Sequence, residues 1–226
     1  MKICVFSPYS NIPELAAITV PNKRKYCERH GYDFLTPPLG GTGINQDEMY
    51  GFRRRMPMAI ELLKSNKYDW IWVVGVDILV TNHTIKLESI VDDNYGMIVG
   101  TEPTGVGMDS YIVRSQKGGL EFIELVASYR NNPIGATHEQ STIDTLCKQN
   151  PELLKVLKLV PQRILNAYKY DTLRHYSVLH PGFANSTDCF GNSGEWQPGD
   201  FVLHTPGISD EQKWTLLLEA CKHVQE

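Results

Sequence analysis

Short hydrophobic runs alternate with amphipathic stretches along the whole chain. The most apolar run, residues 70–74, is typical of a strand that is buried on both faces. Hydrophobic runs predict strands at residues 2–7, 32–35, 70–74, 97–100, 111–113 and 201–203. Helical periodicity or helix-start signals predict helices at residues 12–30, 52–66, 120–129, 140–147 and from 209 onward. This order predicts an α/β sandwich with a largely parallel central sheet, which binds ligands at the carboxyl ends of its strands.

Capping residues set several of the expected boundaries. Pro21 is expected to open a second helix within residues 12–30, because proline favours the first helical turn. Gly31 stands where a left-handed C-cap is wanted. Ser209 and Gln212, three positions apart, form a capping box for the last helix. Residues 36–46 are rich in proline and glycine, so a loop is expected there.

Composition indicates an ordinary globular protein. The chain has 226 residues, of which 42% are hydrophobic and 21% charged, and we expect one domain over residues 1–226. The formal net charge of −4 argues against a general nucleic-acid partner, which requires a basic excess. The sequence contains no run of about 18 apolar residues, so no membrane span is predicted.

The five cysteines are widely spaced and form no CxxC pair. We interpret them as reduced thiols in a cytosol-like compartment. Residues 1–6 lead directly into a predicted strand, without the pattern of a signal peptide. The sequence therefore predicts a soluble, cytoplasmic chain, either bacterial or viral or separated from a membrane anchor.

Two polar residues at the ends of apolar strands are candidates for metal binding. Asp77 follows the strand at residues 70–74, and a carboxylate in such apolar surroundings is costly unless it is paired or bound to a cation. His204 ends the run at residues 201–203, and imidazole with carboxylate suits Mn²⁺. Structural alternatives are a turn cap for Asp77 and a backbone-bonded core histidine for His204.

Glu139 and Gln140 lie at a predicted helix start. An acidic group there is stabilised by the helix dipole, so a purely structural role is the alternative to a functional one.

Six segments follow one another in the order of a known family. They are Asn22–Asp33 (NKRKYCERHGYD), Gly51–Pro57, Tyr68–Asn82, Glu139–Gln140, Pro161–Tyr168 and Gly199–His204. In this order the chain resembles glycosyltransferase family 34. The resemblance implies a GT-A fold and a retaining transfer of a sugar from a UDP- or GDP-sugar to a glycan or other hydroxyl acceptor.

The resemblance also implies a divalent cation, Mn²⁺ or Mg²⁺, under the donor diphosphate. In the family, a DxD motif and a later histidine hold the metal. Asp77 matches the second acid of that motif, Val76 its middle residue and His204 the histidine. Gly75 stands in place of the first acid, which alters the expected site.

Further residues on the donor side are carried over by position. Arg55 stands where the family has a lysine and would bind phosphate. Ser7 and Tyr9 are expected at the base and ribose, and Gly207 in the turn that follows the metal histidine. Lys213 is a candidate substitute for a family lysine that this chain lacks.

Residues around the transferred sugar complete the expected site. Glu139, Gln140 and Asp109 are the catalytic candidates, and they would hold sugar hydroxyls and stabilise an oxocarbenium-like state. The acceptor side is expected to contain Gln162, Asn166, Tyr168 and Trp196, with Trp196 stacking on a sugar ring.

Two other functions compete with this prediction. One is a transferase related to glycosyltransferase family 8. The other is an inactive module that binds a nucleotide-sugar or glycan, and Gly75 is the residue that favours it. A generic nucleotide-binding protein has no support, because no GxGxxG or Walker loop is present.

Overall fold

The computed structural model of the chain describes residues 1–9, 12–37, 51–129 and 139–226, without the side chains of residues 51–54. Most of the loop expected at residues 36–46 lies outside these ranges.

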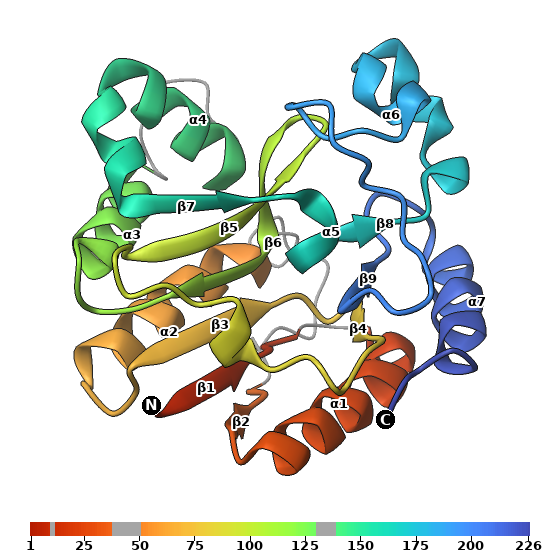
Figure 1. The fold of residues 1–226 in the computed structure, drawn as a ribbon, viewed down its shortest axis with the longest axis horizontal. Coiled ribbons are helices and arrows are strands. Elements are labelled where there is room, and N and C mark those ends of the chain that lie inside the picture. The colour runs from red at the N-terminus through yellow and green to blue at the C-terminus, as the bar shows by residue number, and fades with distance from the viewer. Residues whose placement is uncertain (10–11, 38–50, 130–138) are drawn as a thin grey trace.

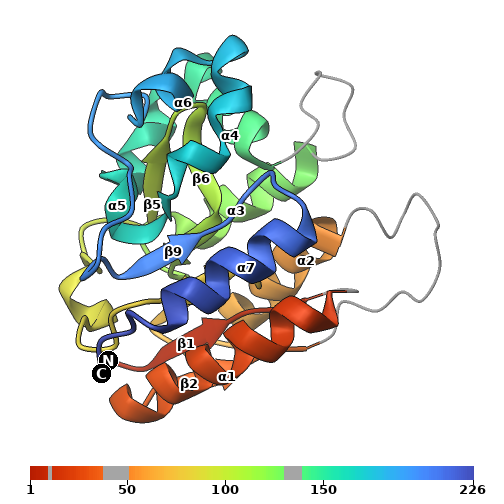
Figure 2. The same cartoon turned by 90° about the vertical axis from the view of Figure 1, so that its right-hand side faces the viewer.

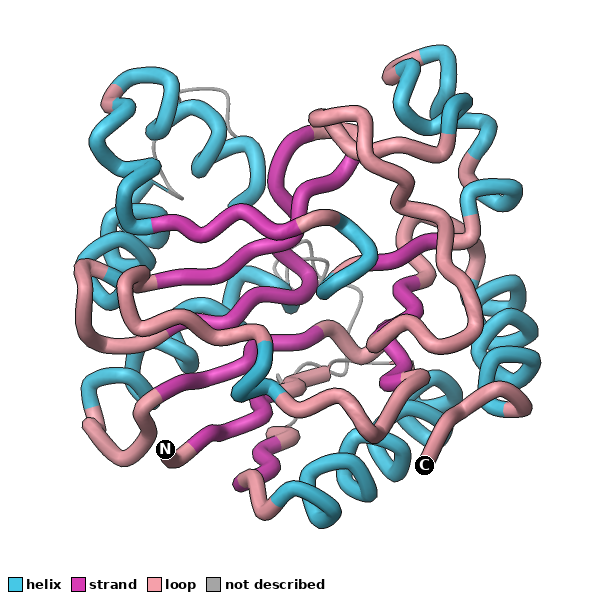
Figure 3. Tube along the Cα trace, viewed as in Figure 1, coloured by secondary structure: helices cyan, strands magenta, loops and turns pink. Residues whose placement is uncertain are grey.

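A six-stranded sheet forms the centre of the fold, in the order β2-β1-β3-β6-β5-β7 (Figures 1 and 3). Its strands are β1 Ile3–Phe6, β2 Asp33–Leu35, β3 Trp70–Val74, β5 Met97–Glu102, β6 Gly105–Val113 and β7 Leu157–Val160. Strand β6 runs antiparallel to both of its neighbours, and the other pairings are parallel. The expected α/β architecture with a mostly parallel sheet is therefore confirmed.

After β3 the chain enters a second, smaller sheet. It consists of β4 Ile78–Val80, β9 Val202–His204 and β8 Ala167–Tyr168, in the order β4-β9-β8. Ile78 is paired directly with His204. Because Asp77 precedes Ile78, this register places His204 beside the turn between β3 and β4.

Helices lie on both sides of the central sheet and around the small sheet. They are α1 Pro13–His30, α2 Gly51–Lys64, α3 Gly119–Ser128, α4 Glu139–Gln149, α5 Gln162–Leu165, α6 Pro181–Asn185 and α7 Asp210–Cys221. Short 3₁₀ helices occupy η1 Leu87–Ser89, η3 Pro151–Val156, η4 Tyr170–Thr172 and η5 Arg174–Val178. Figure 2 shows α1 and α7 side by side at one end of the sheets.

Strand β3 joins two apolar cores. Ile71 and Val73 pack with side chains of α2, α3 and α4 on one face of the sheet. Trp70 and Trp72 pack on the other face, in a cluster that includes Tyr26 of α1. The strand is thus buried on both faces, as its uninterrupted apolar run predicts.

The helix boundaries confirm two expectations and correct one. Gly31 adopts φ 73° at the end of α1, and Ser209 and Gln212 form the capping box of α7. The expected helix break at Pro21 is wrong, because α1 runs through that residue without interruption. Proline removes one backbone donor from the helix, and the tertiary packing of α1 tolerates this loss. Among the described residues, no helix is long and apolar enough to cross a membrane.

Candidate active site

Three side chains converge where the two sheets meet. Asp77 lies in the turn between β3 and β4, His204 ends β9, and Asp109 lies within β6. His204 Nε2 is 3.6 Å from Asp77 Oδ1 and 3.9 Å from Asp109 Oδ2. The two residues that the sequence assigns to a metal are therefore neighbours, and a second carboxylate stands close to them.

The ring of His204 is oriented by Asn166. Asn166 Nδ2 donates hydrogen bonds to Glu102 Oε2 at 3.1 Å and to Tyr168 Oη at 2.9 Å. Its Oδ1 therefore faces His204 Nδ1 at 2.7 Å, and that ring nitrogen carries the proton of the neutral imidazole. The lone pair is then left on Nε2, the nitrogen that faces the two aspartates.

His204 Nε2 is a buried polar atom without a hydrogen-bond partner in the described part of the chain. The residue is only 1% exposed. Such an unpaired buried acceptor costs free energy unless a ligand satisfies it.

Asp77 is held between Lys213 and His204. Lys213 of α7 donates to Asp77 Oδ2 at 2.8 Å, and His204 lies on the side of Oδ1. Burial raises the pKa of Asp77, but His204 and Lys213 outweigh burial and hold it below its ordinary value. Asp77 is therefore an ionised carboxylate at neutral pH.

Arg55 of α2 orients Asp109. Its Nη1 donates to Asp109 Oδ1 at 3.1 Å, and its Nη2 donates to the Met108 carbonyl at 2.9 Å. Burial lowers the pKa of Arg55, but the facing Asp109 outweighs burial and holds it above its ordinary value. One oxygen of Asp109 is thus bound, and the other faces His204.

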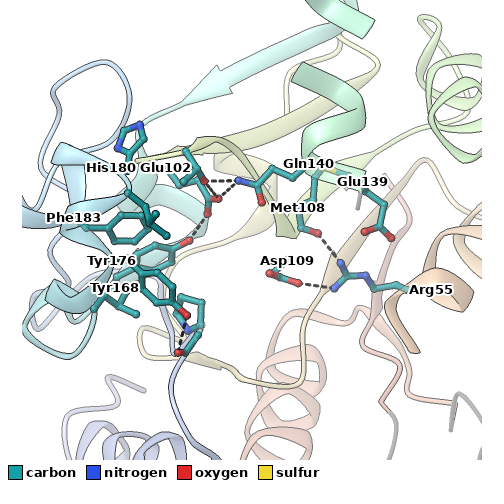
Figure 4. A pocket seen from close by; sticks show the side chains of 15 residues that line it. Arg55, Glu102, Met108, Asp109, Glu139, Gln140, Tyr168, Tyr176, His180 and Phe183 are labelled. Carbon is teal, nitrogen blue, oxygen red and sulfur yellow. Dashed lines mark hydrogen bonds and ion pairs between the residues drawn. The ribbon is translucent and has the colours of Figure 1, made fainter. Parts of the chain in front are cut away.

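A pocket of about 680 Å³ opens beside these residues (Figure 4). Arg55, Asp109 and Glu139 line one side of it. Aromatic and apolar side chains of the segment from η4 to α6 line the other side: Leu173, Tyr176, Leu179 and Phe183. The pocket thus combines a charged side with an apolar wall, as small-molecule sites commonly do.

A buried network around Glu102 connects the pocket to His204. Gln140 Nε2 and Tyr168 Oη donate to the carboxylate of Glu102, which also accepts from Thr104 at 2.8 Å. Burial raises the pKa of Glu102 above its ordinary value. Glu102, Gln140 and Tyr168 all line the pocket, so the support of His204 is part of the pocket wall.

The other residues expected on the donor side come from several elements. Ser7 follows β1 and is fully buried, with a hydroxyl that has no partner in the described ranges. Tyr9 is half-buried, and Val76 is buried with its carbonyl bound by Thr19. Gly207 has φ +66° and lines the pocket, where its carbonyl accepts from Tyr176.

The residues expected at the acceptor fall into two groups. Tyr168 lines the pocket. Gln162 and Asn166 are fully buried and bound to other side chains, so neither lines it. Stacking of Trp196 on a sugar is a wrong expectation, because its ring is buried beside Lys169 and donates to Thr81.

The donor set fits a divalent cation that is completed by a ligand. Within the described ranges, no three His, Cys, Asp or Glu side chains are assembled as a metal centre. The buried lone pair of His204 nevertheless faces the ionised Asp77 across 3.6 Å. Imidazole and carboxylate are suitable ligands for Mn²⁺.

Two parts of this site were not predicted from the sequence. Glu102 ends the apolar strand β5, so the rule that selected Asp77 also applies to it. The apolar wall formed by Leu173, Tyr176 and Phe183 carries no comparable signal, because isolated aromatic residues in loops are common.

Sequence comparison finds one matching family. Residues 3–95 and 92–215 match the galactosyl transferase GMA12/MNN10 family. An uncharacterised α-1,2-galactosyltransferase of Schizosaccharomyces pombe, C637.06, is 22% identical over 194 residues, which is 69% of this chain and 55% of the relative. A probable α-1,2-galactosyltransferase of that yeast, gmh2, is 21% identical over 249 residues, which is 91% of this chain and 64% of the relative. The chain thus spans 55% to 64% of the length of these relatives.

Solved structures with a similar fold are glycosyltransferases. One is involved in the glycosylation of the major capsid of PBCV-1; its TM-score is 0.70 at 18% identity, over 97% of this chain and 100% of that one. The galactosyltransferase LgtC, in complex with donor and acceptor sugar analogues, has a TM-score of 0.55 at 11% identity, over 99% of this chain and 97% of that one. These similarities show the GT-A fold.

Proposed function

The chain belongs to the galactosyl transferase GMA12/MNN10 family, and from that premise we propose that it transfers a sugar from a nucleotide-sugar to a hydroxyl acceptor. The observation that carries the proposal is the buried lone pair of His204, which faces the ionised Asp77 next to Asp109 of the pocket wall. Inert cores avoid such an arrangement, because it leaves a buried acceptor beside a carboxylate.

In this proposal, Asp77 and His204 hold a divalent cation, Mn²⁺ or Mg²⁺. A cation there would neutralise the charge that develops on the leaving nucleoside diphosphate. Asn166 keeps the proton of His204 on Nδ1, so that Nε2 remains a ligand. Burial excludes water from the ring and strengthens the attraction between these groups.

Two basic residues flank the expected diphosphate. Lys213 contacts Asp77 Oδ2 and would turn toward a phosphate oxygen when a cation takes its place on the carboxylate. Arg55 lies on the pocket wall with a guanidinium that stays charged at every relevant pH. Both supply positive charge where the donor carries negative charge.

The sugar is expected between the polar side of the pocket and its apolar wall. Glu139 and Gln140 begin α4 on the polar side, where they would bind sugar hydroxyls. Tyr176 and Phe183 offer ring faces on the opposite wall, which suits the apolar face of an acceptor sugar. The matched yeast relatives are named α-1,2-galactosyltransferases, and an α-linked product from an α-linked UDP-sugar implies retention.

A donor panel tests the proposal. UDP- and GDP-sugars are incubated with the protein, with Mn²⁺ or EDTA, and the released nucleotide and the anomeric configuration of the product are measured. We expect turnover of at least one donor that EDTA abolishes. Asp77→Asn and His204→Ala should each lower the rate on the order of a hundredfold, because both remove charge stabilisation in the transition state.

Asp171→Asn serves as the matched control, because Asp171 is an exposed aspartate that pairs with Arg174 outside the pocket. Its rate should equal that of the wild type. Tight binding of a nucleotide-sugar without turnover of any donor would contradict the proposal and favour a binding module.

A further inference from the structure

We propose that Asp109 supplies the second carboxylate of the cation site, the one that is missing at Gly75. The inference rests on the proposed metal-dependent transfer and adds a ligand that reaches the cation from a neighbouring strand. It gives Asp109 a place at the metal instead of at the sugar.

The sheet register places the two positions opposite each other. Strands β3 and β6 are antiparallel, with Val74 paired to Ser110, so the next pair along the ladder is Gly75 and Asp109. Gly75 N–H donates to the Asp109 carbonyl at 2.7 Å. Directly opposite residues of an antiparallel pair project to the same face, with Cβ atoms about 5 Å apart. A carboxylate lost from position 75 can therefore be replaced from position 109.

Asp109 is oriented for this task. Arg55 binds its Oδ1, while its Oδ2 lies 3.9 Å from His204 Nε2. Its side chain is 48% exposed, so it can rotate toward an incoming cation without breaking a packed core. Asp77 and His204, in contrast, are fixed by their surroundings.

Two of the separations lie within reach of one shared cation, and a rotation of Asp109 would complete a set of three ligands that is not assembled in the described ranges. A cation about 2.1 Å from each of two ligands can span up to about 4.2 Å between them. His204 Nε2 is 3.6 Å from Asp77 Oδ1 and 3.9 Å from Asp109 Oδ2, and both separations fall within that span. His204 Nε2 is also the unpartnered, buried atom of the cluster, so an ion bound there would satisfy it.

A side chain at position 75 would crowd the space that Asp77 and Asp109 share. A Cβ at position 75 would lie 2.8 Å from Asp77 Oδ1 and 3.5 Å from the Asp109 carbonyl. The tip of the Asp77 side chain would have to shift, and with Asp109 also present a third carboxylate would add like-charge repulsion. A carboxylate at 75 and one at 109 are thus alternative solutions to the same requirement.

Binding of Mn²⁺ tests the inference without reference to turnover. Mn²⁺ is titrated into the protein alone and at saturating UDP, with a UDP-only blank, and the electron paramagnetic resonance signal of the free ion is followed. Asp109→Asn, which keeps the size of the side chain, should weaken Mn²⁺ binding roughly tenfold to a hundredfold. Asp171→Asn is the control and should bind as the wild type does.

A relocation variant separates loss of the ligand from loss of the ion pair with Arg55. The double variant Gly75→Asp with Asp109→Asn returns a carboxylate to the site but not the negative charge that faces Arg55. We expect it to recover most of the Mn²⁺ affinity. Wild-type affinity in Asp109→Asn alone would overturn the inference, and so would a double variant that folds but binds no better than that single variant.

The failure of this inference can be told apart from that of the proposed function. If the wild type binds Mn²⁺ and Asp77→Asn does not, but Asp109→Asn is unaffected, only the role of Asp109 is wrong. If the wild type binds no Mn²⁺ with or without UDP, metal-dependent transfer is contradicted together with the role of Asp109.

Discussion

Two side chains of the site each have one polar atom bound by a neighbour and another that is free to bind a ligand. His204 has one ring nitrogen bound to Asn166 and the other unpaired, while Asp109 has one oxygen bound to Arg55. In both cases a neighbour binds one polar atom of the side chain and leaves another that faces the same small volume. This is the arrangement by which outer residues orient metal ligands.

Replacing Asn166 tests this arrangement. Asn166→Ala removes the acceptor for His204 Nδ1 and the donor to Glu102, so the ring of His204 loses its fixed tautomer and orientation. We expect Mn²⁺ affinity to fall roughly tenfold to a hundredfold, measured by the titration described above.

Gln162→Leu is the matched control for that variant. Gln162 is equally buried and bonds Tyr170 without touching His204, so its replacement should lower stability but not the Mn²⁺ affinity of the folded protein. Equal Mn²⁺ affinity in Asn166→Ala and the wild type would show that Asn166 has a purely structural role.

Some of these side chains could be predicted from the sequence residue by residue, and others could not. Asp77 and His204 are detectable because each is a polar residue at the end of an apolar strand. Asn166 was expected at the acceptor, because nothing local tells a buried amide from a pocket amide. Its orientation depends on Glu102 and Tyr168, which come together only in the folded chain.

At the scale of elements, α1 supports the turn that carries Asp77. Lys23 is fully buried and its Nζ donates to the Gly75 carbonyl at 2.8 Å, while Thr19 donates to the Val76 carbonyl at 2.6 Å. Burial lowers the pKa of Lys23 from 10.5 to about 7. The helix therefore fixes the turn with a lysine whose charge is costly to bury.

That cost predicts a pH-dependent stability. Between about pH 7 and 10.5 the unfolded chain keeps the proton on Lys23 and the folded chain releases it, so the unfolded state binds more protons. Relative to Lys23→Met, the wild type should become more stable as pH rises, by up to about 1.4 kcal/mol per pH unit. Urea unfolding of both proteins over that pH range measures the difference in the free energy of unfolding. A difference that stays flat or falls with pH would contradict the lowered pKa of Lys23.

Elements were predicted best where local signals were strong. The β3 run, the C-cap at Gly31 and the capping box at Ser209 each depend on residues close together in sequence. The helix through Pro21 was not predicted, because local preference is overridden by packing against the sheets. The full length of β6 was also missed, since its glycines and Asp109 interrupt the apolar pattern.

At the scale of the whole molecule, the site exists because two sheets meet. The large sheet contributes Asp109 from β6, the small sheet contributes His204 from β9, and the turn that joins β3 to β4 contributes Asp77. The antiparallel pairing of β6 could not be derived from hydrophobic pattern, because that pattern does not give strand direction. The role that we propose for Asp109 depends on that pairing.

In the proposed mechanism, Asp77 and His204 bind one cation beneath the diphosphate of the donor. The most direct measurement is anomalous diffraction from crystals soaked with Mn²⁺ and UDP. We predict a single strong anomalous peak bonded to Asp77 and His204 Nε2, with Lys213 displaced from Asp77 Oδ2. Bound UDP with no peak between these side chains, or with the peak elsewhere, would contradict the account.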